Sequence, residues 1–283
     1  MSPERTPPLP GPLLAFGLTT ASLLLLILVA LLLFEAVGQV TAVAIGTVVG
    51  LGGMGTLVGR LVPEPADVRI GLRPMAPRWW GILLLLLPVL LWSSEIDNWI
   101  AVWVPRPELP EQAARSSLAL LEGAIVGILL QPILEEFFFR GVLLQGVASS
   151  MRSLAACVFV GALWALYRSI GAGASPYVVS ILAVSVVEGT LLGALRLASG
   201  SLFAPIALRA GMAAVGYLLV TYEALLPIAG FNAPGAHTPA VWLLASAVPL
   251  AIGLALLHRA FQSREPLPPL PIREDDEDDG VIF

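Results

Sequence analysis

The amino-acid sequence predicts an all-α fold, a polytopic integral membrane helical bundle with about eight transmembrane helices. Of its 283 residues, 57% are hydrophobic and 12% are charged, which is about half the charged fraction of a soluble domain. The apolar residues form repeated runs of roughly 18 to 25 residues, and each run can cross a hydrocarbon core of about 30 Å as a helix. These features exclude an ordinary soluble globular protein, and none of them points to nucleic acid.

The apolar runs set the order of the predicted helices. The stretch from Gly141 to Met151 is expected to continue the fourth run or to form a short interfacial helix. In the second run, six glycines between Gly46 and Gly59 predict close approach to a neighbouring helix, because small residues allow helices to come together in lipid. The predicted spans are about 13–35, 40–59, 80–104, 117–139, 153–170, 177–198, 202–225 and 240–258.

The placement of arginine predicts the orientation of the chain. All 15 basic residues are Arg, and those near span ends fall into three groups that eight spans would bring to one side. Positive residues favour the cytoplasmic side, whereas the loop from Glu95 to Arg115 is net acidic and suits the opposite side. We therefore expect both termini in the cytoplasm, with the chain in a bacterial inner membrane. The groups are Arg60, Arg69, Arg73 and Arg78; Arg140 and Arg152; and Arg259, Arg264 and Arg273.

The end of the chain differs in composition from the spans. Residues 266–283 begin with a Pro-rich stretch and contain the acidic run from Glu274 to Asp279. Such a segment buries too little apolar surface to fold alone, so we expect a disordered, solubilising tail. Docking to a basic partner is the alternative. The single cysteine, Cys157, excludes an internal disulfide.

Ionisable residues within a membrane span cost about 2.5–3.5 kcal/mol each at the helix centre, so they mark a function or an internal ion pair. The clearest group is Gln131-Pro-Ile-Leu-Glu135-Glu136-Phe-Phe-Phe-Arg140 in the fourth run. Glu136 and Arg140 are four residues apart, which predicts an ion pair on one helix face. Glu135 projects about 100° away, toward another neighbour, and is available as a base.

A simpler interpretation is that both acids lie at the water interface and end the helix. The Phe residues between the acids and Arg140 favour a buried position. Pro132 is expected to interrupt the span just before the acids, and a helix broken at depth usually lines a cavity. We therefore expect a buried site.

The pattern Glu135-Glu136-x-x-x-Arg140 resembles the first motif of the CPBP family of glutamic intramembrane endopeptidases. This family includes the eukaryotic CAAX prenyl protease and bacterial bacteriocin-processing and immunity proteins. The second family motif, an aromatic residue followed four positions later by His, corresponds here to Trp164 and Arg168. The resemblance implies an intramembrane endopeptidase-like core over 117–225. It leaves N-terminal membrane spans and loops over 1–116, a last span over 226–265 and the tail over 266–283.

The third family motif is His followed four positions later by Asn. A Gly-rich helix and a turn lead to it, and Glu188 to Gly193 and Ser199 to Ile206 match that approach. The motif itself reads Arg209 and Ala213. The resemblance thus implies that Arg168 and Arg209 replace both motif His residues, and that Ala213 replaces the motif Asn.

The resemblance also implies roles for these positions. In the family, the first Glu and the first His activate a water, the second His and the Asn stabilise the oxyanion, and the second Glu and the Arg hold the site together. Carried over, Glu135 is the base and Glu136 with Arg140 is the structural pair. No cofactor or metal is implied, and His237 and His258 are interpreted as interfacial residues.

The substitutions change the expected chemistry. Arg168 stays protonated and cannot share a proton with Glu135 as an imidazole can, and its charge would stabilise the carboxylate and weaken it as a base. Arg209 can still donate hydrogen bonds to an oxyanion, whereas Ala213 cannot. We therefore predict a pseudo-active site closed by ion pairs between the two glutamates and the arginines Arg140, Arg168 and Arg209.

Three functions remain open at this stage. The first is an inactive or weakly active protease-like protein that binds a membrane-embedded protein or peptide tail, or an active paralogous protease. The second is an active protease in which Glu135 works with Arg209 as electrophile. The third is a transporter or channel using Glu122 and Glu188, although these acids are equally suited to partner Arg209 or Arg196.

Overall fold

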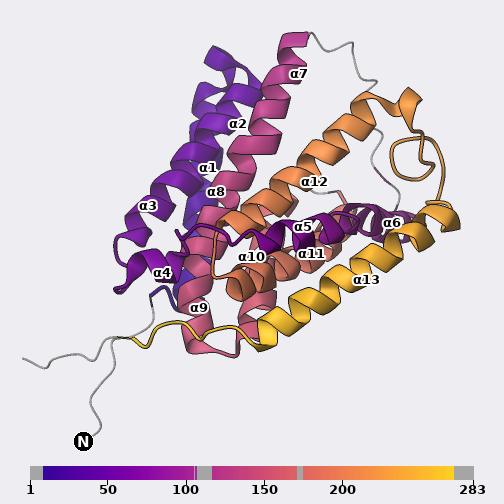
Figure 1. The fold of residues 1–283 in the computed structure, drawn as a ribbon. Coiled ribbons are helices and arrows are strands. Elements are labelled where there is room, and N and C mark those ends of the chain that lie inside the picture. The colour runs from indigo at the N-terminus through magenta and orange to yellow at the C-terminus, as the bar shows by residue number, and fades with distance from the viewer. Residues whose placement is uncertain (1–8, 105, 107–116, 171–174, 271–283) are drawn as a thin grey trace, which may run out of the picture.

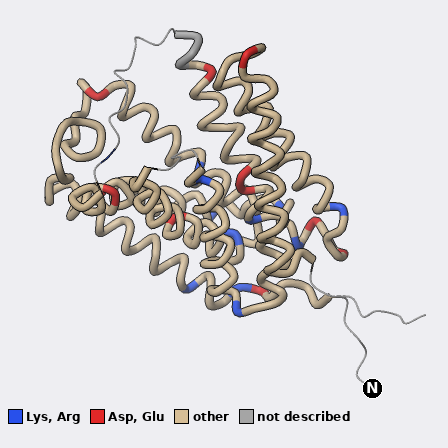
Figure 2. Tube along the Cα trace, turned by 180° about the vertical axis from the view of Figure 1, so that it is seen from behind, with Lys and Arg blue, Asp and Glu red and all other residues tan. Residues whose placement is uncertain are grey.

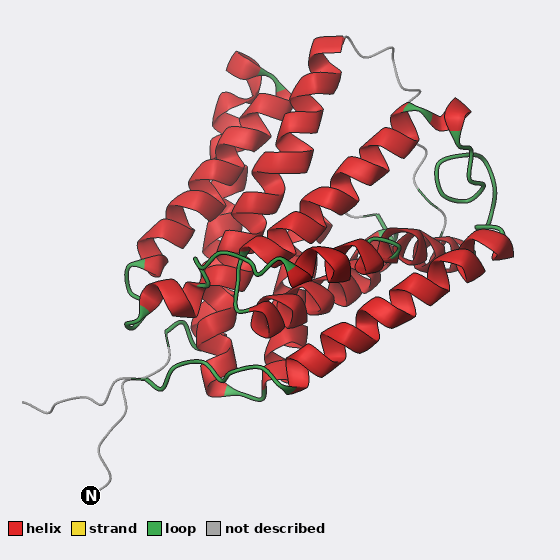
Figure 3. Ribbon diagram, in the orientation of Figure 1, coloured by secondary structure: helices red, strands yellow, loops and turns green. Residues whose placement is uncertain are grey.

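The protein is built from helices, and the predicted all-α fold is confirmed (Figures 1 and 3). The computed structural model describes residues 9–104, 106, 117–170 and 175–270. In these ranges, β pairing is limited to an isolated bridge between Ala229 and Ala233. Six helices are long and apolar enough to cross a membrane: α1 (Pro12–Val37), α2 to α3 (Gln39–Gly59), α5 to α6 (Arg78–Ala101), α11 (Val178–Ser199), α12 (Phe203–Thr221) and α13 (Ala240–Gln262).

Two of these spans are made of several helical segments, and short helical elements lie in the connections. The second is α2 (Gln39–Thr47), the π-helical segment η1 (Val48–Gly53) and α3 (Met54–Gly59). The short helix α4 (Ala66–Ile70) precedes the third, which consists of α5 (Arg78–Leu86) and α6 (Val89–Ala101). A 3₁₀ turn, η5 (Glu223–Leu225), follows α12.

The other two predicted spans correspond to helices of a different kind. α10 (Ser153–Ser169) has 17 residues and is shorter than the six candidate spans. The fourth predicted span lies in a helical run that extends from the top to the bottom of Figure 1. The structure therefore supports a membrane protein with six candidate spans, and the count of eight stays a prediction. The run consists of α7 (Ser117–Ala124), η2 (Ile125–Leu130), α8 (Gln131–Glu136), η3 (Phe137–Leu143) and α9 (Leu144–Ser150).

Two expectations about this run have different outcomes. The helical continuation after Gly141 is confirmed, because helix extends to Ser150. The interruption at Pro132 is wrong, since the run is helical on both sides of the proline. The π-helical turns of η2 end at Leu130, so Pro132 lies in the first turn of α8. A proline lacks an N–H donor and cannot form an i to i−4 bond; here it follows a π-helical segment, in which that bonding pattern is already replaced by i to i−5 bonds.

Glycines bring the second span against α1, as predicted. A Cβ atom added to Gly46 would lie 2.7 Å from the carbonyl oxygen of Leu26, and one added to Gly50 would lie 2.5 Å from that of Ser22. Both distances are shorter than a side-chain carbon tolerates. The two glycines therefore let the backbones of these helices come into direct contact.

A second close approach joins α10 to α11 at the centre of the molecule. A Cβ atom on Gly189 would lie 2.7 Å from the Cα atom of Gly161 and 3.1 Å from Nη2 of Arg140. The buried core surrounds this crossing and includes Phe138, Phe139, Trp164, Leu192 and Leu195. The contact places α10 and α11 directly beside Arg140 of η3.

Several connections gather at the lower end of the bundle in Figure 1, which we call the near end. The backbone N–H of Leu202 donates to the Gly71 carbonyl at 2.8 Å, and Nη2 of Arg69 donates to the Pro268 carbonyl at 2.7 Å. The segment after α3, the α11–α12 turn and the segment after α13 thus meet there, with arginines along the lower edge of Figure 2. The expected position of Arg140 in a loop with Arg152 is wrong, because Arg140 is fully buried inside η3.

A hydrogen-bonded cluster holds the opposite end, where the loop 226–239 packs on α6. Nδ1 of His237 lies 2.9 Å from Oε1 of Glu95, and the backbone N–H of Thr238 donates to Oε2 of the same residue at 2.9 Å. The amide of Asn98 donates to the Gly230 carbonyl. His237 therefore helps to anchor this loop, and its interpretation as an interfacial residue stays a prediction.

Candidate functional site

The site begins with a buried ion pair inside the run from α8 to η3. Nη1 of Arg140 lies 2.9 Å from Oε1 of Glu136, and both side chains are 0% exposed. Nη2 of Arg140 also donates to the carbonyl oxygen of Gly189 at 3.2 Å. The two glycines at the α10–α11 crossing make this bond possible, because a side chain on Gly189 would meet the guanidinium. The predicted pairing of Glu136 with Arg140 is found, and it also ties the run to α11.

Glu135 faces α10 instead. Its Oε2 accepts a hydrogen bond from the indole Nε1 of Trp164 at 2.8 Å, and the same oxygen lies 3.9 Å from Nη1 of Arg168. Glu135 is 2% exposed, whereas the Arg168 side chain is 35% exposed. One oxygen of the expected base is therefore held by a neutral donor and lies near a cation.

Trp164 organises the three arginines as well. Its ring lies 4.7 Å from the Cζ atom of Arg140, 5.2 Å from that of Arg168 and 5.3 Å from that of Arg209. These are cation–π distances, and the indole is the aromatic group that attracts cations most strongly. The residues expected to converge from three helices thus meet around one buried indole.

Arg209 takes part in this cluster without an ion pair. Its Nε atom is buried and has no hydrogen-bond partner among the described residues, and no glutamate of this part of the chain lies within ion-pair distance of it. The predicted ion pair of Arg209 is therefore not found, because its guanidinium stacks on Trp164 instead. Ion pairs are found for Arg140 and, at longer distance, for Arg168.

Two cavities border the cluster and contain different site residues. We call the first the Glu135 cavity; it has a volume of about 330 Å³ and is lined by Thr47, Gln131, Glu135, Tyr167 and Arg168 among others. The second, the Arg209 cavity, has a volume of about 440 Å³ and its lining includes Arg168, Glu188, Arg209, Met212 and Ala213. Of the described residues, only Arg168 lines both. Arg168 therefore lies between the carboxylate of Glu135 and the expected oxyanion positions.

The two acids considered for an ion path, Glu122 and Glu188, have separate surroundings. Glu188 lines the Arg209 cavity beside Arg168 and Arg209. Glu122 accepts a hydrogen bond from the hydroxyl of Thr41, so it does not pair with Arg209 or Arg196. Arg196 instead donates to the carbonyl oxygens of Ile70 at 3.1 Å and Arg69 at 2.7 Å.

Sequence reasoning identified the charged members of the site but gave Trp164 too small a part. The motif comparison assigns Trp164 only the place of the aromatic residue in the second motif. Its signal was available, because a tryptophan four residues before an arginine on one helix lies on the same face and carries a donor that needs a partner when buried. Nothing in the sequence indicates that Glu135 and Arg209 border different cavities.

The comparisons with known proteins agree with this geometry. Residues 117–215 match the family model described as "Type II CAAX prenyl endopeptidase Rce1-like". This segment includes the run from α7 to α9, then α10, α11 and most of α12, and therefore Trp164 and all the charged residues of the cluster around it. No curated protein and no solved structure matches the chain significantly. The chain thus has six candidate membrane spans, and residues 117–215 are similar to the Rce1-like CAAX protease family domain.

Proposed function

We propose that this protein is a degenerate member of the Rce1-like family that binds a membrane-embedded protein or peptide tail, or an active paralogous protease, and hydrolyses peptide bonds weakly or not at all. The observation that carries the proposal is the position of Arg168, which lines both cavities while Glu135 lines one and Arg209 lines the other. Family membership of the domain is consistent with substrates that are C-terminal segments of membrane proteins.

The separation of Glu135 from Arg209 matters because hydrolysis of a peptide bond needs the base and the oxyanion donors around the same carbonyl carbon. The base must reach the attacking water, and the oxyanion donors must lie about 3 Å from the oxygen that becomes negative. Glu135 and Arg209 border different cavities here, so a peptide carbonyl in either cavity meets only one of the two groups. This arrangement also argues against the pair acting as base and electrophile in an active protease.

The chemistry of the replacing residues adds to this loss. A general base contributes about 10²–10⁴ in rate, and one oxyanion donor contributes about 10²–10³. Arg168 cannot accept a proton, and Ala213 has no side-chain donor. We therefore expect a cleavage rate several orders of magnitude below that of a family member with its His and Asn residues.

Binding is favoured by what the site retains. The Arg209 cavity combines apolar residues such as Leu90, Val184 and Met212 with four charged residues, which are Asp97, Arg168, Glu188 and Arg209. A mostly apolar cavity with a few placed polar groups is typical of a ligand site. We infer that an apolar segment with a polar end enters here, as the C-terminal tail of a membrane protein would.

Cleavage of a lipid-embedded peptide by the purified, reconstituted chain tests the proposal. The parent and Glu135→Ala are expected to cleave the peptide at the same background rate. A pull-down experiment should nevertheless show that the parent binds the peptide. A variant that restores the motif residues, Arg168→His with Arg209→His and Ala213→Asn, should cleave at least about 100-fold faster than the parent. Cleavage by the parent that disappears in Glu135→Ala would instead establish an active enzyme.

A further inference from the structure

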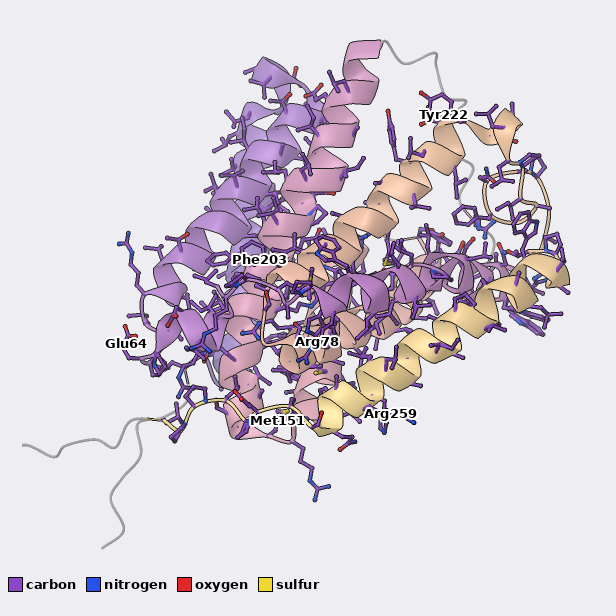
Figure 4. The ribbon with its side chains drawn as sticks, in the orientation of Figure 1. Glu64, Arg78, Met151, Phe203, Tyr222 and Arg259 are labelled. Atoms are coloured by element: carbon purple, nitrogen blue, oxygen red, sulfur yellow. The ribbon has the colours of Figure 1, made fainter. Side chains whose placement is uncertain are left out.

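A third cavity lies at the near end, away from the family site. Its volume is about 490 Å³. Its walls come from the α9–α10 turn, the α11–α12 turn, residues 68–74 and the segment 264–270, which we call the C-terminal strap. Figure 4 labels Met151 in the α9–α10 turn, where the strap passes beside it at the lower end of the molecule. None of its lining residues belongs to the charged cluster around Trp164.

Positive charge dominates this near-end cavity. Arg73, Arg196 and Arg264 line it, with Glu265 as the single acid among the described lining residues. None of the three guanidiniums forms an ion pair within the described part of the chain. The hydroxyl-bearing residues Ser149, Ser153 and Ser199 also line it. The hydroxyls of Ser149 and Ser199 donate to backbone carbonyls of the chain, so what the cavity offers an anion is mainly its net positive charge.

The strap forms one wall and is held by a buried arginine. Nη2 of Arg69 donates to the carbonyl oxygens of Pro268 and Pro269 at 2.7 and 2.8 Å, and both prolines line the cavity. Arg69 is 0% exposed, and its Nε and Nη1 atoms have no partner among the described residues. A fourth cation without a carboxylate thus lies directly behind the wall. Buried charge of this kind is tolerated best when an opposite charge is close.

The cavity is amphipathic and lies where apolar spans end. Leu197, Leu267 and Leu270 line it beside the arginines. Arg196, Leu197 and Ser199 line it from the last turn of α11, and Arg264 follows the end of α13 by two residues. A soluble anion would use only the polar half of such a lining, whereas a phospholipid would use both halves. Basic pockets at the ends of membrane helices are a known way to bind anionic headgroups.

We propose that this near-end cavity binds the phosphate group of an anionic phospholipid. Arg73 and Arg264 contact the phosphate, Arg196 contributes charge from the α11 side, and the leucines contact the start of the acyl chains. The proposal is independent of peptide binding at the family site. It assigns the cavity a ligand class, and it explains why several guanidiniums gather at one end without acidic partners.

Lipid binding by the purified full chain tests this inference. Native mass spectrometry with dioctanoyl phosphatidylglycerol should show binding to the parent, and zwitterionic dioctanoyl phosphatidylcholine should bind much more weakly. The double variant Arg73→Gln with Arg264→Gln should bind phosphatidylglycerol roughly 25-fold more weakly, because each cation near an anionic lipid contributes about fivefold. Arg196 is left unchanged, since its bonds to the carbonyls of residues 69 and 70 hold the near end together.

The matched control is Arg259→Gln, which removes an exposed arginine on the last turn of α13 that does not line the cavity. Figure 4 labels this residue on α13. It should leave the affinity for phosphatidylglycerol unchanged, and an unaltered melting temperature will show that the double variant is folded. Inorganic phosphate is then added at a concentration similar to that of the lipid. If it displaces phosphatidylglycerol, the cavity binds phosphate from a soluble source as well; if it does not, the lipid is the ligand.

Two results would overturn the inference. The first is equal binding of phosphatidylglycerol by the parent and the folded double variant. The second is binding that begins only after residues 271–283 are removed, because the acidic run of that segment would then be the ligand of the arginines.

Discussion

At the residue scale, the site is a cluster of two glutamates and three arginines around an indole, in which Arg209 alone forms no ion pair within the described residues. Glu136 is paired with Arg140, and Glu135 receives the Trp164 N–H while lying near Arg168. In a low-dielectric interior, paired charge is tolerated and isolated charge is not. The same pairing occupies an oxygen of the expected base. The features that stabilise the site therefore also lower its capacity for catalysis.

Trp164→Phe tests how much the indole contributes. The substitution keeps an aromatic ring but removes the N–H donor to Glu135 and weakens three cation–π contacts. We expect the free energy of unfolding to fall by about 1–3 kcal/mol, the usual cost of leaving a buried acceptor without its donor. Denaturant or thermal unfolding of the protein in detergent measures the change.

Trp80→Phe is the control, because Trp80 is 57% exposed. It should change the free energy of unfolding by less than about 0.5 kcal/mol, as surface substitutions usually do. An equal effect of the two substitutions would mean that the hydrogen bond to Glu135 contributes nothing.

At the scale of elements, the α10–α11 crossing determines whether the charged residues can meet. Gly161 and Gly189 remove the side chains that would otherwise separate the two helices. Arg140 then reaches the carbonyl of Gly189, and Trp164 on α10 lies over the guanidinium. In lipid no hydrophobic driving force brings helices together, so their association depends on close van der Waals packing, which small residues allow.

Gly189→Ala should disrupt this crossing. The added Cβ atom would lie 2.7 Å from Gly161 and 3.1 Å from Arg140, so one of the two contacts must give way. Overpacking of this kind costs about 1–3 kcal/mol, and a lower melting temperature in detergent will report it. Gly81→Ala on α5 is the matched control, because nothing lies within 4 Å of its added Cβ atom. That control should be neutral or slightly stabilising, and a Gly189→Ala protein as stable as Gly81→Ala would contradict the prediction.

At the scale of the whole molecule, the bundle has two different ends. The near end collects the segments around Arg69, Arg73 and Arg264, and the opposite end is fastened by Glu95, Asn98 and His237. Arginine at one end is what the positive-inside rule predicts for a cytoplasmic face. The orientation in the membrane follows as a prediction from this asymmetry.

Thiol labelling can test the orientation with little background, because the only cysteine, Cys157, is fully buried. We expect Ser263→Cys, after α13, to react with a membrane-impermeant maleimide from the cytoplasmic side. Ala236→Cys, in the exposed loop before α13, should react from the opposite side. Labelling of both cysteines from the same side would refute the predicted topology.

The sequence by itself determined that most of the chain is surrounded by lipid and that it is helical. The length of the apolar runs required helices in lipid, and the spacing of Glu136 and Arg140 required a pair on one helix face, because both depend on local geometry. Only the tertiary structure decided that the helix passes through Pro132, that Trp164 joins the arginines, and that Arg168 separates Glu135 from Arg209. These features depend on how α8, α10 and α12 approach one another in space, and no spacing along the chain encodes the distance between side chains on different helices.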